Sequence, residues 1–451
     1  MKQRRAWSKG LALMLLALAL VATACGGGGK NNGGSGGSAG GGNGGGSTGG
    51  GSTGGGSTEL SIMWWGPDAR HEATLAALDV YTKQNPNVTF KPEYMAWDAY
   101  WQKLPTLVAS KTVTDVLQMD AAYIQDYASK GVLADLSDID LSGIVSDNVL
   151  ENLKIDGKLY GIPLSLNAQG YAYNKTKLEE YGIKLPWKDW TWEDYFNWAR
   201  EAREKLPDGV YPIGDVNTWD GYQYYQTAMG KGPIMQDGGK KFNLDKDLFI
   251  EFFNTYAEFR KQGIVPPAEV SAAFLENDPQ ADPMASGKVM TRGATVGSVS
   301  ALEDLLPGQV EVVNTPVGPA GGGWAQSTIF LSVSANTPDM EEAKKFVKWF
   351  ITDEEGGKTL GLTRGIPIND AIYKLLEPDM QRRDILGKEL YEVSVDKALP
   401  FYGTAAGWTE WTDYFKAQME AVQFGQQSVE QAYENIAKMG EETAAKVASA
   451  G

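Results

Sequence analysis

The stretch that decides the fold is residues 59–136, ELSIMWWGPDARHEATLAALDVYTKQNPNVTFKPEYMAWDAYWQKLPTLVASKTVTDVLQMDAAYIQDYASKGVLADL. Leu60, Ile62 and Trp64 occupy alternate positions, which predicts a strand. Residues 70–84 then predict a helix that Asn85-Pro86 stops. Further strands are predicted at 88–93 and 115–119, and further helices at 98–110 and 121–130. This alternation predicts an α/β fold that begins with a parallel sheet, whose ligands bind beyond the carboxyl ends of the strands.

Later blocks extend the pattern. They are DGKLYGIPLSLNAQGYAYNKTKLEEYGI (156–183), TWEDYFNWARE (191–201) and FVKWFITDEEGGKTLGLTRGIPIN (346–369). As an ordered set, these blocks and the first stretch resemble the extracellular solute-binding protein family 1, the sugar-binding lipoproteins of ABC importers. The resemblance runs from about residue 59 to the end. It implies a two-lobe periplasmic-binding-protein-like fold (type II), in which hinge strands join two α/β lobes and the sugar lies in the cleft between them.

The resemblance also suggests where the chain crosses between lobes. Crossings are expected near 164–173, 288–293 and 331–335. Lobe one is then residues 59–166 plus 291–333, and lobe two is residues 167–290 plus 334–451.

The N-terminus predicts a lipoprotein signal peptide over residues 1–24. A basic segment precedes the apolar run 11–24, which is too short for the roughly 20 residues that span a bilayer. Ala22-Thr23-Ala24-Cys25 resembles the lipobox of bacterial lipoproteins, although that motif prefers Leu where Ala22 stands. An ordinary secretory signal with an incidental cysteine is the alternative. Cys25 is the only cysteine, and lipidation explains an exported thiol without a disulfide partner.

Residues 25–58 predict a lipidated cysteine followed by a flexible Gly/Ser/Thr-rich linker. Of the residues from 26 to 58, 20 are Gly, and such a segment has no apolar surface to bury. We expect an exported protein anchored by lipid to the outer face of the cell membrane.

The charge of the remaining chain excludes nucleic acid as a partner. Five of the 41 basic residues and none of the 57 acidic residues precede Glu59, so the net charge from there on is −21. Nucleic acids and anionic membranes require a basic surface instead. We expect a monomer whose partners are a carbohydrate and the permease subunits of an ABC transporter.

Catalytic options are few, and we predict no enzyme activity, no cofactor and no metal. His71 is the only histidine, so neither Cys–His chemistry nor a zinc site built from several His and Cys is possible after residue 25. No G-x-S-x-G motif follows residue 58. Two carboxylates could still hydrolyse a glycoside. A surface-anchored glycosidase therefore remains a minor alternative, beside a carbohydrate sensor or adhesin.

Ligand-binding candidates combine aromatic and polar side chains, because a sugar stacks its C–H face on a ring and hydrogen-bonds through its hydroxyls. Trp64 and Trp65 point to opposite faces of a strand, so we expect one to be packed and Trp65 to line the cleft; the alternative is that both are ligand-binding residues of the cleft. Asp120 either accepts sugar hydroxyls or caps the following helix. One of Trp408 and Trp411, which are three residues apart, should stack on sugar. The remaining candidates, at predicted loops or crossings, are Trp97, Asn167, Trp219, Arg292, Trp324 and Arg364.

Five other residues have structural explanations. Thr191 and Asp194 form a predicted capping box, and Trp192 and Trp198 in the same helix are expected to be structural. His71 is expected to be a solvated or hydrogen-bonded helix residue.

Overall fold

A computed structural model describes residues 57–450. The predicted signal peptide, Cys25 and nearly all of the predicted linker lie outside the described residues. Among the helices that the structure does describe, none has both the length and the apolar character needed to cross a membrane.

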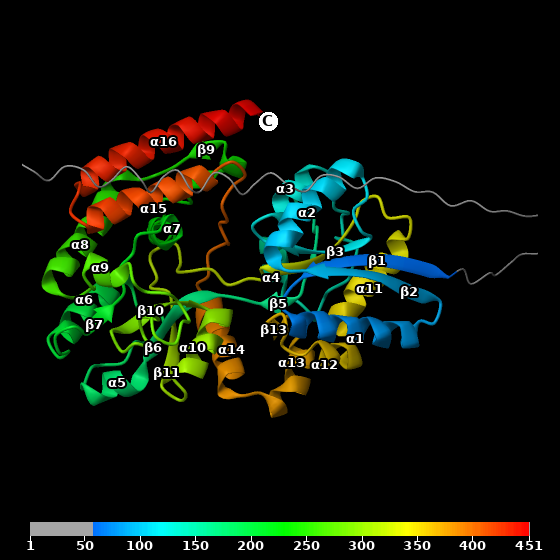
Figure 1. Ribbon diagram of the computed structural model, residues 1–451, viewed down its shortest axis with the longest axis horizontal. Coiled ribbons are helices and arrows are strands. Elements are labelled where there is room, and N and C mark those ends of the chain that lie inside the picture. Colours follow the sequence, from blue (N-terminus) through cyan, green and yellow to red (C-terminus); the bar gives the residue numbers. More distant parts are fainter. Residues whose placement is uncertain (1–56, 451) are drawn as a thin grey trace, which may run out of the picture. The chain divides into compact units, whose positions relative to one another are not determined.

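Lobe one is built on a five-stranded sheet of order β2-β1-β3-β12-β4 (Figure 1). The first three strands are parallel, as predicted, and β12 runs antiparallel to β3, with Ile329 opposite Asp120. The strands are β1 (Thr58–Trp65), β2 (Val88–Met95), β3 (Val116–Asp120), β4 (Ile162–Pro163) and β12 (Ile329–Val333). The helices are α1 (Asp68–Gln84), α2 (Trp97–Ser110), α3 (Ile124–Ser129), α4 (Asp147–Leu153), α11 (Met340–Thr352), α12 (Glu354–Leu360) and α13 (Asp370–Leu376).

Local sequence explains the first β–α unit. β1 lies between two strands, and its apolar residues Leu60, Ile62 and Met63 are buried. α1 begins after Pro67, with Asp68 in its first turn, where a negative charge favours the helix dipole. It ends at Asn85, because Pro86 disfavours helical backbone in the residue before it.

Lobe two is built on a four-stranded mixed sheet of order β11-β6-β10-β7. β10 is antiparallel to β6 and parallel to β7. The strands are β6 (Gln169–Asn174), β7 (Tyr211–Ile213), β10 (Val289–Thr295) and β11 (Val310–Asn314). The helices are α5 (Lys175–Glu180), α6 (Trp192–Arg203), α7 (Trp219–Ala228), α8 (Lys246–Gln262), α9 (Ala268–Ser271), α10 (Val296–Leu305), α14 (Arg382–Val395), α15 (Thr409–Gln423) and α16 (Val429–Ala450). Two small ribbons pair β5 (Ser165–Leu166) with β13 (Ile366–Pro367) and β8 (Met235–Gln236) with β9 (Lys241–Phe242).

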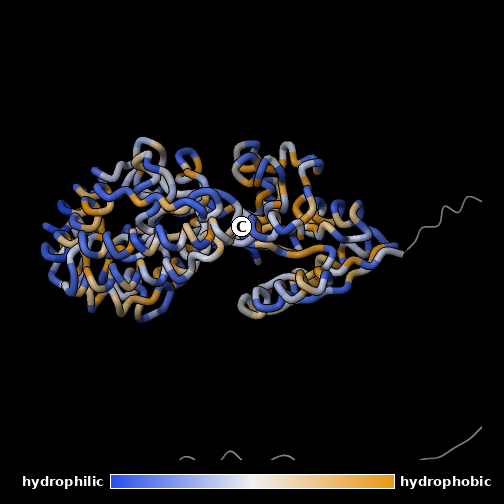
Figure 2. The backbone as a smooth tube through the Cα atoms, turned by 90° about the horizontal axis from the view of Figure 1, so that it is seen from above, coloured by the Kyte–Doolittle hydropathy of each residue, from blue (hydrophilic) through white to orange (hydrophobic). Residues whose placement is uncertain are grey.

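Each lobe has its own large apolar core. In Figure 2, hydrophobic segments lie inside each lobe and hydrophilic ones predominate along the outer helices. The capping box of Thr191 and Asp194 is confirmed at the start of α6, and Trp192 and Trp198 are buried in the lobe-two core. The prediction that these two tryptophans are structural is confirmed.

Three crossings join the two sheets. The first runs from β4 to β6 and matches the expected one near 164–173. The second runs back from β11 to β12, and these two crossings are hydrogen-bonded side by side. The N–H of Gln169 donates to the carbonyl of Trp324 at 2.8 Å, and that of Gln326 donates to Asn167 at 2.9 Å. The third connects β13, beside β5, with α14, which packs on the lobe-two sheet.

The expected lobe boundaries need correction. Residues 291–333 were assigned to lobe one, but β10 and β11 pair with β6 of lobe two. Residues 334–451 were assigned to lobe two, but α11 and α12 pack on the lobe-one core. The expected crossing at 288–293 is therefore wrong, and the one at 331–335 lies earlier, before β12. Strands of both sheets show the same short apolar runs, so local sequence does not specify which sheet a strand joins.

Candidate ligand-binding site

The first candidate surface is the carboxyl edge of the lobe-one sheet. Trp64, at the end of β1, is fully buried, and its Nε1–H donates to Nδ1 of His71 at 3.1 Å. The ring of Tyr94 packs against both, with centroid distances of 5.2 Å to Trp64 and 4.6 Å to His71. Burial lowers the pKa of His71, which favours the neutral form that this bond requires. Trp64 is thus a core residue, and His71 is the hydrogen-bonded helix residue expected.

Trp65 does not lie free at the end of its strand, contrary to expectation. It is 5% exposed, because Trp97, Tyr100 and Trp101 of α2 surround its ring at centroid distances of 5.0–5.5 Å. The accessible aromatic surface of this edge belongs instead to Tyr94, which is 43% exposed, and to Trp97 and Tyr123, each 39% exposed. Tyr123 lies 4.1 Å from Trp101, centroid to centroid. We call Trp97 and Tyr123 the aromatic platform.

Asp120, the last residue of β3, lies at the same edge. Its Oδ1 accepts the backbone N–H of Ala122 at 2.9 Å, while α3 begins only at Ile124. Asp120 therefore caps the turn that precedes α3 and does not cap the helix itself. The predicted helix cap is wrong, and only the turn is capped. Burial raises the pKa of Asp120 to about 6, and the Ala122 bond offsets this only in part. Within the described residues Asp120 forms no salt bridge, so its second oxygen can accept a donor from a ligand.

The second candidate surface is a pocket of about 520 Å³ in lobe two, which we call the lobe-two pocket. Its lining comes from β6 and β10, from α7 and the loop before it, and from the segment after α9. The residues that line it include Gln169, Tyr171, Trp192, Tyr195, Asp215, Asn217, Thr218, Asp220, Tyr224, Ser271, Phe274, Glu276, Thr291, Arg292, Thr295, Ser298, Thr315 and Gln423.

Some residues of this pocket carry buried polar atoms without a partner. Five lining residues carry such an atom: Gln169 Oε1, Trp192 Nε1, Ser271 Oγ, Thr291 Oγ1 and Arg292 Nε. Burying a polar group without a hydrogen bond is costly, and native proteins satisfy nearly all of them. Three of these atoms are obligate donors or acceptors and two are hydroxyls that serve as either. The lobe-two pocket is thus lined by residues that can both donate and accept hydrogen bonds.

The ionised groups of the pocket are mostly paired. Arg292 is 6% exposed and forms salt bridges with Glu276 and Asp282, both at 3.0 Å. Asp215 pairs with Arg260 at 2.6 Å. Burial raises the pKa of Asp215, and Arg260 opposes that rise. Burial also raises the pKa of Tyr171 to about 12, so its phenol stays neutral at ordinary pH. The lining therefore consists of neutral hydrogen-bonding groups and of charged groups that are mostly neutralised by salt bridges.

Residues 76–386 match the family described as bacterial extracellular solute-binding protein. The chain belongs to this family. It is 27% identical over 319 residues to the diacetylchitobiose binding protein DasA of Streptomyces coelicolor, covering 67% of this chain and 71% of the relative. It is 30% identical over 253 residues to the lactose-binding protein of Rhizobium radiobacter, covering 54% and 55%. An extracellular solute-binding protein family 1 from Alicyclobacillus acidocaldarius superposes with a TM-score of 0.76 at 26% identity, covering 86% of this chain and 99% of that one.

The fold of this solute-binding protein is the two-lobe fold predicted, but several predicted site tryptophans lie in its lobe-two core. Trp408 and Trp411 are both fully buried, and their Nε1–H groups donate to the carbonyls of Gly239 and Ile436 at 3.0 Å. Neither is free to stack on sugar, contrary to expectation. Trp324 is 6% exposed and packs edge-on against Phe401. These tryptophans were predicted as ligand-binding residues because of their large apolar rings. In the structure, residues distant in sequence pack against those rings and bury them.

Trp219 and Asn167 remain near the expected positions. Trp219 is half-buried against Trp411, between the pocket-lining residues Thr218 and Asp220. Asn167 lies in the first crossing, where its Nδ2 donates to Oγ1 of Thr328 at 3.1 Å. It thus links the first two crossings to each other.

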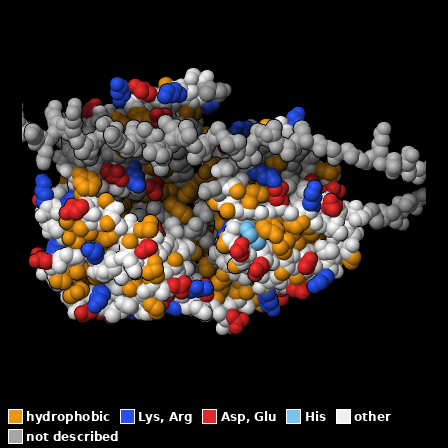
Figure 3. Space-filling view, in the orientation of Figure 1, with side chains coloured by type: hydrophobic (Ala, Val, Ile, Leu, Met, Phe, Trp, Pro, Cys, Tyr) orange, Lys and Arg blue, Asp and Glu red, His pale blue; other side chains and the backbone are white. Residues whose placement is uncertain are grey.

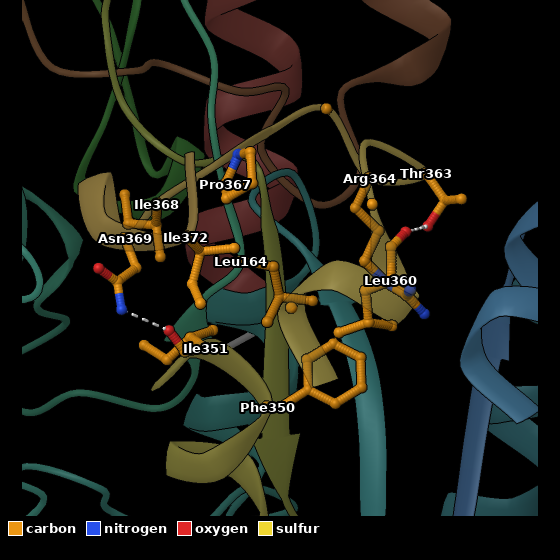
Figure 4. Close-up of a pocket in the computed structure, with 13 residues that line it drawn as sticks. Leu164, Phe350, Ile351, Leu360, Thr363, Arg364, Pro367, Ile368, Asn369 and Ile372 are labelled. Carbon is orange, nitrogen blue, oxygen red and sulfur yellow. Dashed lines mark hydrogen bonds between the residues drawn. The ribbon is translucent and has the colours of Figure 1, made fainter. Parts of the chain in front are cut away.

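Arg364 lies away from the lobe-two pocket. It is 9% exposed and lines a separate small cavity of lobe one, of about 40 Å³, with Leu164, Phe350 and Ile372 (Figure 4). Its Nε donates to Oε1 of Gln118 at 2.9 Å, and its Nη2 donates to Oγ1 of Thr74 at 3.0 Å. Burial holds the pKa of Arg364 below its usual range. Of the two arginines predicted to bind ligand, only Arg292 lines the lobe-two pocket.

Several pocket residues were missed by the sequence reasoning. Tyr171 shares one face of β6 with the hinge amide Gln169, and that period of two was a usable signal. Ser271, Thr291 and Gln423 come from three distant elements. No local pattern connects them, because only the tertiary fold brings them together.

Proposed function

We propose that this solute-binding protein captures a carbohydrate outside the cell and delivers it to the permease of an ABC importer. The observation that carries the proposal is the set of five unpartnered buried polar atoms around the lobe-two pocket. A sugar presents hydroxyls that donate and accept in several directions, so one ligand can satisfy donors and acceptors together. A purely apolar ligand would leave all five without a partner.

Two further observations support a sugar. The aromatic platform of Trp97 and Tyr123 exposes rings at the carboxyl edge of the lobe-one sheet, where α/β proteins bind ligands, and rings suit the C–H face of a pyranose. The relatives named above include proteins described as binding diacetylchitobiose and lactose.

Binding without hydrolysis fits the charges better than a glycosidase does. A hydrolase needs one carboxylic acid and one free carboxylate about 5–10 Å apart across the bond. Of the three carboxylates that line the pocket, Asp215 and Glu276 are each bound to an arginine. The proposal includes the lipid anchor at Cys25 and a position on the outer face of the membrane. A sensor or adhesin would bind sugar in the same way and differ only in its lack of a transport partner.

A thermal-shift screen over neutral mono- and oligosaccharides tests the proposal. A ligand at 100 times its Kd adds about 2.7 kcal/mol to the free energy of unfolding, which is readily measured. The best ligand is then titrated by calorimetry against two threonine variants. Failure of every sugar to bind the folded protein would refute the proposal.

The two variants form a matched pair. Thr291→Val removes an unpartnered hydroxyl in the pocket, so we expect weaker sugar binding and no loss of stability. Thr227→Val removes a buried hydroxyl that donates to the carbonyl of Gln223 at 2.7 Å, away from the pocket. It should cost about 1 kcal/mol of stability and leave affinity unchanged. Equal effects of the two changes on affinity would mean that Thr291 does not face the ligand.

A further inference from the structure

The lining of the lobe-two pocket carries more acidic than basic groups. Asp215, Asp220 and Glu276 line it, and Arg292 is its one lining guanidinium among the described residues. Behind this lining, Arg260 pairs with Asp215 and Asp282 pairs with Arg292. Four carboxylates thus face two guanidinium groups, which leaves a formal charge of −2 when all are ionised.

Arg292, the lining cation that could bind an acidic sugar, already has hydrogen-bond and salt-bridge partners. Arg292 Nη1 donates to Glu276 and to the carbonyl of Gly293, and its Nη2 donates to Asn277 and pairs with Asp282. Only Nε lacks a partner. To form a bidentate salt bridge with this arginine, a uronate would have to displace a carboxylate that is already bound there.

The arginines of the lobe-one edge are also engaged in hydrogen bonds, although Nη1 of Arg364 is buried without a partner. Arg70 donates from Nε to the carbonyl of Thr363 and from Nη1 to that of Trp65. Arg364 is buried against the ring of Phe350 and is bonded to Gln118 and Thr74. Neither is placed as a free guanidinium at the lobe-two pocket.

Asp220 is the unpaired member of the acidic set. It is exposed in the first turn of α7, and within the described residues it forms no salt bridge or side-chain hydrogen bond. It lies on the pocket wall beside Tyr224, so it can accept sugar hydroxyls but repels a sugar carboxylate.

Resting on the proposed function, we infer that the lobe-two pocket selects neutral sugars and rejects uronates, with Asp220 as a specificity-determining residue. The discrimination is electrostatic, since the unpartnered donors and acceptors other than Arg292 Nε are neutral and suit both kinds of sugar. It should therefore weaken with ionic strength, because Asp220 is solvent-exposed.

Calorimetry with a neutral disaccharide and the diuronate of the same linkage tests the inference. We expect the neutral sugar to bind at least about 100-fold more tightly at low salt, because carboxylates within a few Å of each other repel strongly at a partly buried site. Asp220→Asn should raise the affinity for the diuronate, relative to that for the neutral sugar, about 10-fold. Asp247→Asn is the matched control, because Asp247 is an exposed acid in the first turn of α8, outside the lobe-two pocket.

A second measurement needs no variant. In the wild-type protein, diuronate affinity should rise between about 20 mM and about 500 mM NaCl while neutral-sugar affinity stays constant. Diuronate binding that equals or exceeds neutral binding, or that weakens with salt, would overturn the inference and leave the proposed function intact. If the folded protein binds neither kind of sugar, the proposed function and this inference fail together.

Discussion

Replacing Asp120 by Asn should stabilise the protein at neutral pH. Burial raises the pKa of Asp120 from the usual 3.8 to about 6. The folded state therefore holds a proton that the unfolded state has already lost between those two pH values. Stability falls as pH rises through this window, and above about pH 6 the full penalty is present. A shift of about two units corresponds to about 3 kcal/mol, which Asn avoids while its Oδ1 can still accept from Ala122.

The assay is urea denaturation of wild type and variant from pH 4 to pH 8. The free energy of unfolding of the two proteins should be nearly equal at about pH 4. Above about pH 6 that of Asp120→Asn should exceed that of the wild type by about 3 kcal/mol. Asp140→Asn is the control, because Asp140 accepts the N–H of Ser142 in the same kind of turn but is exposed. Hydrogen bonds from Ser142 lower the pKa of Asp140, so its substitution should shift stability in the opposite direction. A difference for Asp120→Asn that does not vary with pH would refute the reasoning.

The remaining predictions concern the anchor, the aromatic platform and catalysis. Cys25→Ser should release the protein into the medium with its fold intact, and lipid labelling with membrane fractionation checks this; a variant that stays lipid-labelled contradicts it. Trp97→Ala should weaken sugar binding by about 1–3 kcal/mol, as for stacking on bases, whereas Trp408→Ala should cost about 3–5 kcal/mol of stability, as expected for a buried tryptophan. Calorimetry and denaturation separate the two, and the reverse pattern would place Trp408 in the site. The best-binding oligosaccharide should remain uncleaved on prolonged incubation, as chromatography would show; turnover abolished by Asp220→Asn would indicate a glycosidase.

Local structure was predictable from sequence wherever neighbouring residues determine it. The alternating apolar residues of β1 and the capping box at Thr191 both appear where predicted. The site was less predictable, because ring exposure depends on distant elements. Trp65 is covered by α2, and Trp408 packs against Phe242 of a small ribbon. The unpartnered atoms of Thr291 and Ser271 could not be recognised at all, since a missing partner is a property of the whole fold.

Both signs of charge are scattered over the face of the described residues seen in Figure 3, and no broad basic area interrupts them there. This agrees with the acidic balance of the sequence.

The pairing of β3 with β12 has a consequence for how the chain folds. Asp120 of β3 lies opposite Ile329 of β12. Along the chain, most of lobe two is therefore inserted between two strands that are neighbours in the lobe-one sheet. Closing a loop of this length costs about 5 kcal/mol of chain entropy before any contact compensates for it, and distant pairings of this kind slow folding. Lobe one therefore cannot complete its sheet until both of its segments have been synthesised. For a chain exported by the proposed signal, we expect the sheet of lobe one to close only after β12 has crossed the membrane.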